Sequence, residues 1–288
     1  MNLNIFFPKI RLHTWGGLGS QLYAVALAIQ IKKRFPYRDI EFICHTSGVT
    51  KREPEIQFFS NIFKTKNDFE DLALNSPASR QNNQKVFINL LTKSLLLVGL
   101  IGRCNSNHEV TKLRPWILMI RGHYTGLDIS SHVALEILQI MEKSFKNNKS
   151  IETNDTSLHY RLGDLINLKE KNPINIKVLS EVILKIDKNN KLNKVHLYSD
   201  SIDIALTELR NIPIKLELIP RKISTLETVL ECVKSSIFIG TNSKISIWIA
   251  ILRAVSSSIN KSYLPSDLKQ IVNKNLGAID LSNSIIYY

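Results

Sequence analysis

After residue 155 the chain alternates short strand patterns with helical patterns of about ten residues, and this regularity restricts its fold more than any other feature. The strand patterns are SLHYRL, KVHLYSD, KLELIP and SIFIGT, and the helical patterns that follow them in turn are IKVLSEVILKID, IDIALTELR, TLETVLECVKS and KISIWIAILRA. Strands that alternate with helices of this length are typical of a parallel sheet with helices on both faces. We therefore predict an α/β fold.

The first half shows the same alternation less regularly. Strand patterns at residues 9–15, 40–46 and 115–122 accompany helical patterns at 21–35, 55–63 and 131–145, and residues 64–85 are polar and irregular. The segment KNNKSIETNDTS, residues 146–157, is nearly free of apolar residues, as linkers between domains often are. We therefore expect two domains, residues 1–150 and 151–288.

The composition suits a chain that buries a core and carries excess positive charge. Of its 288 residues 44% are hydrophobic, and the formal net charge is +13. This charge favours anionic partners, which include nucleotide phosphates, anionic lipid headgroups and nucleic acid. Nucleic acid is the weakest of the three, because the lysines are scattered and form no dense basic arm. The cysteines, Cys44, Cys104 and Cys232, are far apart, which favours a reducing cytoplasm over a disulfide framework or a zinc site.

One hydrophobic stretch, VFINLLTKSLLLVGLIG at residues 86–102, needs its own interpretation. It is about as short as a membrane-spanning helix can be, and Lys93 lies near its centre. We interpret it as a helix buried in the core, with a helix on a membrane surface as the alternative. Near the N-terminus, Pro8 interrupts an apolar run that is too short for a signal peptide.

Polar side chains follow three of the predicted strands, in the segments HYRLGD, YSDS and GTNSKIS. Ligands of parallel sheets bind at the carboxyl ends of strands, so these segments predict a site. Arg161 offers a planar, permanently charged fork of donors that suits a diphosphate. A solvated edge-strand arginine, and a plain helix N-cap at Asn242 or Ser243, are the alternatives.

A glycine-rich turn, WGGLGSQ at residues 15–21, joins the first strand pattern to the first helical pattern. Glycines permit close approach of the backbone to a ligand, and a helix N-terminus favours negative charge. The turn matches neither GxGxxG nor GxxxxGK[ST], so a tight turn without a ligand is an equal alternative. The chain has no DxD motif and no HxxxH or HExxH pair, so we expect no metal ion.

Several of these motifs, in their order along the chain, resemble those of the α-1,2-fucosyltransferases of glycosyltransferase family 11. WGGLGSQLYAVALA is similar to the family's GGLGNQxFQYAxA, IRGHYTG to GYFQ, LHYRLGDL to HxRRGD, LYSDS to FSDD, and GTNSKISIWIA to NSxFSWWxA. The similarity spans roughly residues 10–254. It implies a GT-B-like fold with two Rossmann-like domains facing each other across a cleft, an N-terminal acceptor-side domain and a C-terminal GDP-sugar-binding domain. It also implies inversion at the anomeric carbon without a metal ion.

The resemblance implies roles for individual residues. Arg161 matches the arginine that holds the diphosphate, His159 a histidine near the nucleotide, and Asp164 an aspartate that orients the loop or assists the acceptor hydroxyl. Asp164 is our first candidate for the general base, and His13 is the second. The other donor-binding positions are Gly16, Gly17, Gly19 and Gln21 of the opening loop, Ser199 and Asp200, Asn242, Ser243 and Ser246, and Glu227 as the carboxylate that reads guanine.

The departures from the family's pattern indicate a divergent member. Leu162, Ser20, Ser201 and Ile247 replace an arginine, an asparagine, an aspartate and a tryptophan. We predict transfer of L-fucose from GDP-fucose in α-1,2 linkage to a glycan acceptor, in the synthesis of lipopolysaccharide O-antigen or capsule. The alternatives are another GDP-deoxysugar donor such as GDP-colitose, an inactive nucleotide- or glycan-binding protein of the same fold, and a basic membrane- or nucleic-acid-binding protein.

This reading also predicts partners and a place in the cell. We expect a GDP-sugar donor, an oligosaccharide acceptor that is lipid-linked, no nucleic acid and no cofactor. The expected location is the cytoplasm, with peripheral contact at the inner face of the cytoplasmic membrane, because a positive surface suits an anionic bilayer.

Overall fold

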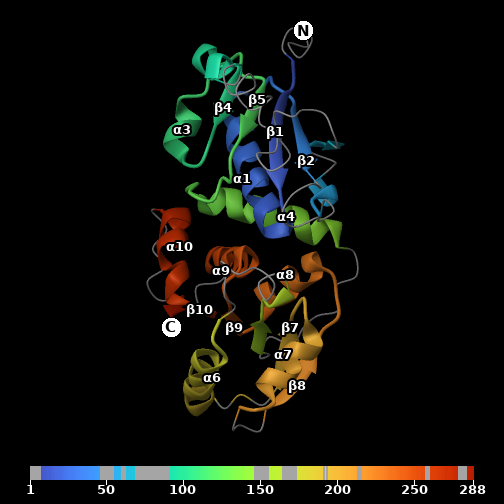
Figure 1. Cartoon of the computed structure of the whole chain (residues 1–288), viewed down its shortest axis with the longest axis vertical. Helices are drawn as coiled ribbons and strands as arrows, with labels where there is room; N and C mark the ends of the chain where they lie inside the picture. Colours follow the sequence, from blue (N-terminus) through green and yellow to red (C-terminus); the bar gives the residue numbers. More distant parts are fainter. Residues whose placement is uncertain are drawn as a thin grey trace. The chain divides into compact units, whose positions relative to one another are not determined.

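The chain divides into two compact units, Met1–Ile129 and Ser130–Tyr288. The computed structural model describes residues 8–45, 55–59, 63–68, 91, 93–145, 156–163, 174–190, 192, 194–212, 216–256, 260–277 and 284–288. Each unit is built on one β-sheet in which the described strand pairs are all parallel (Figure 1). This confirms the α/β fold with Rossmann-like sheets.

The sheet of the first unit has the strand order β3-β2-β1-β5-β4. Its strands are β1 (Ile10–Trp15), β2 (Ile40–His45), β3 (Lys64–Asp68), β4 (Ile101–Arg103) and β5 (Met119–Arg121), and its helical elements include α1 (Leu18–Arg34), η2 (Gln57–Phe59) and α3 (Asn107–Thr111). Helix α1 packs on β1, and most of its residues are buried. A helix buried on nearly all sides is apolar on nearly all sides, as residues 22–29 of α1 are.

The sheet of the second unit has the order β11-β10-β9-β6-β7-β8. Its strands are β6 (Thr156–His159), β7 (Lys194–Tyr198), β8 (Glu217–Pro220), β9 (Ile237–Gly240), β10 (Lys261–Leu264) and β11 (Ile285–Tyr287). Its helices include α4 (Ser131–Ser144), α6 (Ile176–Asn190), α7 (Ile202–Leu209), α8 (Thr225–Lys234), α9 (Lys244–Ser256) and α10 (Lys269–Leu276), with η4 (Ser266–Leu268) before α10. If the strands of this unit are numbered 1 to 6 along the chain, from β6 to β11, their order in the sheet is 3-2-1-4-5-6. This is the order of the classic doubly wound fold.

Alternation along β6 assigns the helices to the two faces of this sheet. Leu158, Tyr160 and Leu162 are buried in one apolar cluster with residues of α6 and α7. His159, whose side chain points the opposite way, contacts Ser246 of α9. Helices α6 and α7 therefore cover one face, and α9 lies on the other (Figure 1).

The strands predicted at 9–15, 40–46 and 115–122 and those of the second half are confirmed. Two short strands of the first sheet were not predicted. Strand β3 falls in the segment predicted to be irregular, because its sequence KTKND carries no apolar alternation although its backbone pairs with β2. Strand β4 has only three residues and lies at the end of the apolar stretch 86–102.

Helix α4 falls before the boundary expected at residues 150/151, yet it groups with the second unit. Its buried face, formed by Val133, Ala134, Ile137, Leu138 and Met141, belongs to a helix that packs against α8 and α9. The compact units therefore separate at Ile129/Ser130, because α4 buries its apolar side on the second unit.

The core interpretation of residues 86–102 is wrong for the described helical residues 93–98, whereas Ile101, at the end of the stretch, is buried. Residues 93–98 are helical, and the side chains of Leu97 and Val98 are 88% and 60% exposed. Within the described ranges, none of the helices combines the length and the apolar character needed to cross a bilayer.

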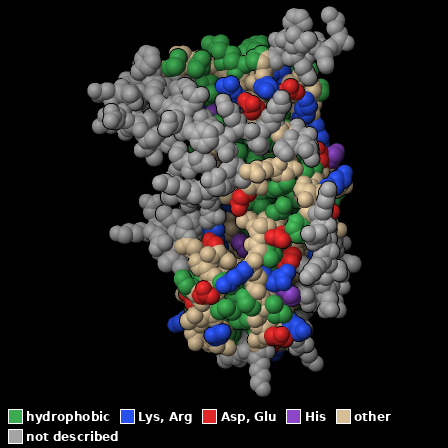
Figure 2. Space-filling view, turned by 90° about the vertical axis from the view of Figure 1, so that its right-hand side faces the viewer, with side chains coloured by type: hydrophobic (Ala, Val, Ile, Leu, Met, Phe, Trp, Pro, Cys, Tyr) green, Lys and Arg blue, Asp and Glu red, His purple; other side chains and the backbone are tan. Residues whose placement is uncertain are grey.

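The cysteines and the surface charges match two simpler expectations. Cys44, Cys104 and Cys232 are buried and form no disulfide. On the face shown in Figure 2, Lys and Arg side chains lie among Asp and Glu side chains rather than in one continuous basic field. This distribution agrees with the scattered lysines of the sequence.

Candidate functional site

The topology of the second sheet singles out the carboxyl ends of β6 and β9. These strands are neighbours, with His159 of β6 opposite Gly240 of β9, and the chain leaves this pair toward opposite edges of the sheet. In doubly wound sheets, ligands bind in the crevice outside the strand ends at such a switch point. The segments HYRLGD and GTNSKIS, predicted to form a site, begin here.

Thr241 fastens the two strand ends together. Its hydroxyl donates to the backbone oxygen of His159 (3.0 Å) and accepts from the backbone N–H of Arg161 (2.9 Å). The side chain of Thr241 is fully buried. Sequence reasoning did not name Thr241, although its place directly after a buried strand was the available signal. The backbone at Arg161 is thereby held at the switch point.

The side chain of His159 is buried beneath the strand ends and is not exposed at them. Its Nδ1 lies 2.9 Å from the Ser246 hydroxyl, and only 8% of the residue is exposed. Burial lowers the pKa of His159 to about 4, with Asp200 opposing that shift and Arg161 adding to it. His159 is therefore a neutral side chain at pH 7 that ties β6 to helix α9.

Arg161 and Asp200 form an ion pair across the ends of β6 and β7. The Arg161 Nη1 lies 2.7 Å from the Asp200 Oδ2, and the two side chains are 19% and 25% exposed. The other carboxylate oxygen, Oδ1, accepts from the backbone N–H of Leu162 (3.0 Å) and of Gly163 (2.9 Å). Asp200 thus positions the arginine and the chain that follows it.

Gly163 is required for this arrangement. A Cβ atom at this position would lie 2.1 Å from Oδ2 and 2.6 Å from Cγ of Asp200. No side chain fits there unless the carboxylate moves. Leu162 beside it is 1% exposed and belongs to the core cluster under α6 and α7. The position that carries the family's second arginine therefore points into the core of this chain.

The start of helix α9 supplies the polar groups on the β9 side. The Ser243 hydroxyl accepts from the backbone N–H of Ile245 (3.1 Å), which is the N-cap arrangement considered as an alternative. The side-chain oxygen of Asn242 is buried, and no described group hydrogen-bonds to it. A buried oxygen without a donor is costly, so a ligand or water N–H or O–H is the natural partner.

Two further predicted residues have local structural partners. The Ser199 hydroxyl accepts from the backbone N–H of Ser201 (3.1 Å) where α7 begins. Glu227 is the third residue of α8, and its Oε2 accepts from the Ser224 N–H (2.8 Å) and hydroxyl (2.6 Å). These bonds to Ser224 lower the pKa of Glu227. Its expected role in reading guanine stays a prediction.

The opening loop belongs to the first unit and is closed by its own chain. Gly16 has φ +77°, the left-handed region that glycine favours. The Gln21 side chain donates to the Gly16 oxygen (2.7 Å) and accepts from the Glu55 N–H (2.8 Å), while the Glu55 carboxylate accepts from the Leu18 N–H (2.6 Å). The anion expected at the start of α1 is therefore supplied by Glu55. Gly17 is the N-cap residue of this helix, and Gly19 is buried in its first turn.

Of the two candidates for the general base, His13 and Asp164, the structure describes only His13. His13 is 1% exposed, its Nδ1 lies 2.8 Å from the His45 Nε2, and Trp15 stacks on His45 with ring centroids 4.7 Å apart. Burial and the neighbouring His45, Arg121 and Arg11 lower the pKa of His13 to about 3, so it is a weak base. Asp164 lies outside the described residues.

The described residues of the site offer a cation and helix amides. Across the described residues, no three His, Cys, Asp or Glu side chains gather so that they could hold a metal ion. Arg161 supplies a permanent positive charge next to the N-terminus of the 13-residue helix α9. An anion, and a diphosphate in particular, is the ligand that such a combination suits.

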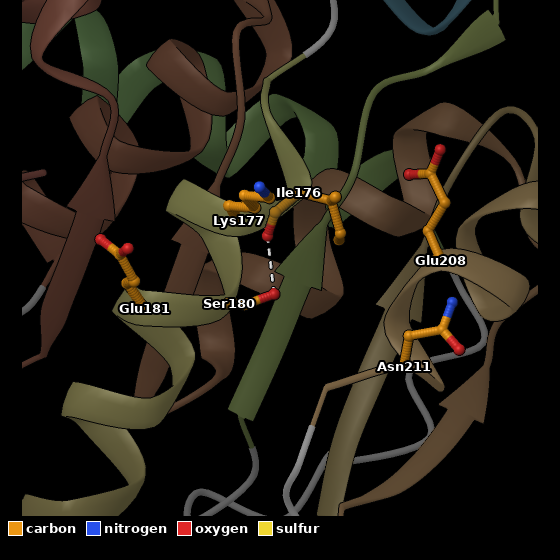
Figure 3. Close-up of a pocket in the computed structure, with 6 residues that line it drawn as sticks. All are labelled: Ile176, Lys177, Ser180, Glu181, Glu208 and Asn211. Carbon is orange, nitrogen blue, oxygen red and sulfur yellow. Dashed lines mark hydrogen bonds between the residues drawn. The ribbon is translucent and has the colours of Figure 1, made fainter.

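A shallow hollow of about 400 Å³ lies elsewhere in the second unit, between the start of α6 and the end of α7 (Figure 3). Its walls contain none of the predicted site residues. The hydroxyl of Ser180 donates within the α6 backbone to Ile176 (2.6 Å), and Glu208 accepts from the Tyr160 hydroxyl. The lining residues are Ile176, Lys177, Ser180, Glu181, Glu208 and Asn211.

No protein-family model and no curated protein sequence matches the chain. Solved structures do resemble it. The E. coli ADP-heptose LPS heptosyltransferase II has 9% identity and a TM-score of 0.48, with 97% of this chain and 90% of that chain covered. A family 9 glycosyl transferase from Veillonella parvula has 10% identity and a TM-score of 0.47, covering 100% and 87%. POFUT1 in complex with GDP has 10% identity and a TM-score of 0.42, covering 89% and 98%. Likeness at this level assigns neither a reaction nor a substrate to this chain.

Proposed function

We propose that the chain is a GT-B, inverting glycosyltransferase of the family 11 type, which transfers L-fucose from GDP-fucose in α-1,2 linkage to a glycan acceptor. The observation that carries the proposal is the position of Arg161 at the switch point of a doubly wound sheet, held by Thr241 and Asp200. The motif resemblance supplies the donor and the linkage. It also supplies the pathway, the synthesis of O-antigen or capsule.

The chemistry that this edge would perform is a single displacement. The acceptor oxygen forms a bond to C1 of the donor sugar on the face opposite the nucleotide. The bond from C1 to the phosphate oxygen breaks, and its electron pair leaves with GDP. The acceptor proton passes to a base, for which we propose Asp164. Inversion at C1 follows from this geometry.

Stabilising the leaving diphosphate is the task of the described residues. Negative charge grows on the phosphate oxygens as the bond breaks, and fixed positive groups lower the energy of that state. Arg161 would supply the charge, and the first amides of α9 would supply neutral donors. Asp200 would act as a positioning residue, since it holds Arg161 by an ion pair.

The donor sugar has a second candidate, another GDP-deoxysugar such as GDP-colitose. We keep it because the chain departs from the family's pattern at Leu162, Ser20, Ser201 and Ile247, and Leu162 is buried in the core where the family has an arginine. The edge therefore has one cation fewer than the family's pattern provides. The loss affects the diphosphate site, and it leaves the contacts to the sugar unassigned.

The test is the release of GDP from GDP-fucose, GDP-colitose and GDP-mannose in the presence of a mixture of glycan acceptors. We expect release from one deoxysugar donor, and a fall of roughly a hundredfold or more in Arg161→Met. Arg210→Met, which removes an exposed arginine at the end of α7, is the matched control and should keep full activity. Full activity of a folded Arg161→Met would contradict the proposed site.

A further inference from the structure

The first unit carries an exposed apolar surface that the proposed reaction does not use. The side chains of Leu97, Val98 and Trp116 are 88%, 60% and 48% exposed, and Leu91, which is also helical, is 40% exposed. We call these four residues the Leu97 surface. Single exposed apolar residues are ordinary, but the indole N–H of Trp116 donates to the Val98 oxygen (2.9 Å), so two separate segments meet here.

The Leu97 surface is held in place by its backbone. The helical residues 93–98 are followed by Gly99, which has φ +78°. The N–H group of Gly99 donates to the Leu96 oxygen, and that of Leu100 donates to the Leu95 oxygen. This pair of hydrogen bonds forms a Schellman motif, which fixes the end of a helix. The Leu100 oxygen in turn accepts from the Leu118 and Met119 N–H groups, just after Trp116. Backbone hydrogen bonds therefore hold in place the two segments that carry the exposed side chains.

The indole of Trp116 can enter an apolar environment without leaving a polar group unpaired. Its single polar group, the ring N–H, is already bonded to the Val98 oxygen, so the ring can leave water without losing a hydrogen bond. A Cβ atom at Gly99 would lie 2.8 Å from the Arg114 Cγ and 3.5 Å from the Trp116 Nε1. The close packing of Gly99 against these two side chains keeps the ring at the surface.

Basic residues outnumber acidic ones in the segment that carries the Leu97 surface. Between residues 93 and 121 the sequence has Lys93, Arg103, Lys112, Arg114 and Arg121 but a single acidic residue, Glu109. Glu109 is engaged in a capping box with Ser106. The Arg114 guanidinium lies 6.0 Å from the centre of the Trp116 ring, and Lys93 shares a helical face with Leu97 because they are four residues apart.

Apolar side chains with one aromatic ring, bordered by lysine and arginine, match the interface of an anionic bilayer. The ring and the leucines enter the acyl boundary, and the long basic side chains reach the headgroups. Anionic lipids attract each nearby basic residue, and the excess of basic over acidic residues here complements them. We propose that the Leu97 surface docks the protein peripherally on an anionic phospholipid bilayer. This proposal is independent of the donor site, since docking needs no nucleotide.

Vesicle flotation tests the proposal on the full chain without donor or acceptor. We expect binding to vesicles of phosphatidylcholine mixed with phosphatidylglycerol that is at least roughly tenfold tighter than to phosphatidylcholine alone. Raising the salt concentration should weaken it, because the attraction to headgroups is screened. Equal binding to both vesicle types, or no binding to either, would overturn the proposal.

Variants locate the contact. Leu97→Ser should lower vesicle binding by roughly tenfold without affecting folding, because the side chain is 88% exposed. Ile204→Ser, on α7 of the second unit, removes an apolar side chain that is 45% exposed and is the matched control that should bind as the parent does. Unchanged binding of Leu97→Ser would overturn the proposal. So would a concentration-dependent dimer that Leu97→Ser abolishes, because the surface would then join two copies of the chain.

Fluorescence gives an independent readout of the same contact. The blue shift of tryptophan emission on anionic vesicles should be present in the parent and absent in Trp116→Phe, which keeps an aromatic ring and should still float. Trp15 and Trp248 serve as internal references, since neither belongs to the Leu97 surface. A shift that persists in Trp116→Phe would place the contact elsewhere and contradict the proposal.

Discussion

Asp200 connects more of the candidate site than any other single side chain that we describe. One oxygen pairs with Arg161, and the other accepts from two consecutive backbone N–H groups, at Leu162 and Gly163. Charge-assisted bonds of this kind are stronger and more directional than neutral ones. The orientation of Arg161, and hence the diphosphate site that we propose, depends on this carboxylate.

Asp200→Asn is expected to weaken GDP binding by roughly tenfold while the chain stays folded, since an amide oxygen can still accept from both N–H groups but no longer pairs with the cation. Calorimetric titration with GDP measures the change. Asp203→Asn, which alters an exposed carboxylate three residues later, is the control and should bind GDP normally. Equal affinities of Asp200→Asn and the parent would mean that Arg161 is not positioned by Asp200.

Gly163→Ala should have a similar effect by a different route. The new methyl group would lie 2.1 Å from the carboxylate oxygen, so Asp200 must move and the pair with Arg161 opens. We expect a loss of about 1–2 kcal/mol in the free energy of unfolding, with a larger relative loss of GDP affinity. Urea unfolding and calorimetry separate the two quantities. Unaltered values of both would show that this edge tolerates a side chain.

His159 makes stability depend on pH. In the folded chain burial lowers its pKa to about 4, from an unfolded value near 6.5. Between these values the unfolded chain binds a proton that the folded chain does not, so the free energy of unfolding falls as the pH falls, by about 1.4 kcal/mol per pH unit. The contribution is complete above pH 6.5 and is lost on acidification. His13, with a pKa of about 3, adds an effect of the same sign.

Replacing His159 by glutamine should therefore flatten the dependence of unfolding free energy on pH between about 6.5 and 4. Urea titrations at several pH values across that window give the slope for the variant and the parent. A slope that does not change on replacement would mean that His159 is protonated in the folded chain.

At the scale of elements, helix α9 is joined to its neighbours by a buried arginine. Arg253 is fully buried, and its guanidinium donates to backbone oxygens in the last turn of α8, in the turn before β9 and at the start of β10. The distances are 2.8 Å to Cys232, 3.0 Å to Ser236 and 3.0 Å to Lys261. Burial lowers the pKa of Arg253 to about 10, which still leaves it charged at pH 7. It closes the C-terminal end of α8 and fixes α9, whose N-terminus borders the site.

Arg253→Met should cost about 3–5 kcal/mol of unfolding free energy, because several buried oxygens would lose their donors at once. Arg210→Met, at an exposed arginine, should change it by less than about 0.5 kcal/mol. Denaturant unfolding of both variants makes the comparison. A loss at Arg253 no greater than at Arg210 would contradict the structural role that we assign to it.

The elements that the sequence predicts well are those whose pattern follows from burial. Strands β6 to β9 are short apolar runs between amphipathic helices, and all four were expected. Strand β3 is polar and pairs only through its backbone, so its sequence carries no corresponding signal. The stretch 86–102 was interpreted as a core helix because an apolar run favours burial, but Leu97 and Val98 within it are exposed.

The candidate site was predictable in its location but not in its internal contacts. Polar residues at three neighbouring strand ends identified the edge around Arg161. The parts played by Thr241 and Gly163 depend on contacts between segments far apart in the chain, and no local pattern reports such contacts. The closure of the opening loop by Glu55 was missed for the same reason, because it lies 37 residues after Leu18.

For the whole molecule, the central claim is that the second unit binds GDP through the edge at Arg161 without a metal ion. Isothermal titration with GDP, UDP, ADP and CMP in the presence of a chelator, for the parent and for Arg161→Met, tests it most directly. We predict selective binding of GDP by the parent and its loss in Arg161→Met. Binding that does not distinguish the nucleotides, that needs a divalent ion, or that survives in Arg161→Met would contradict the claim.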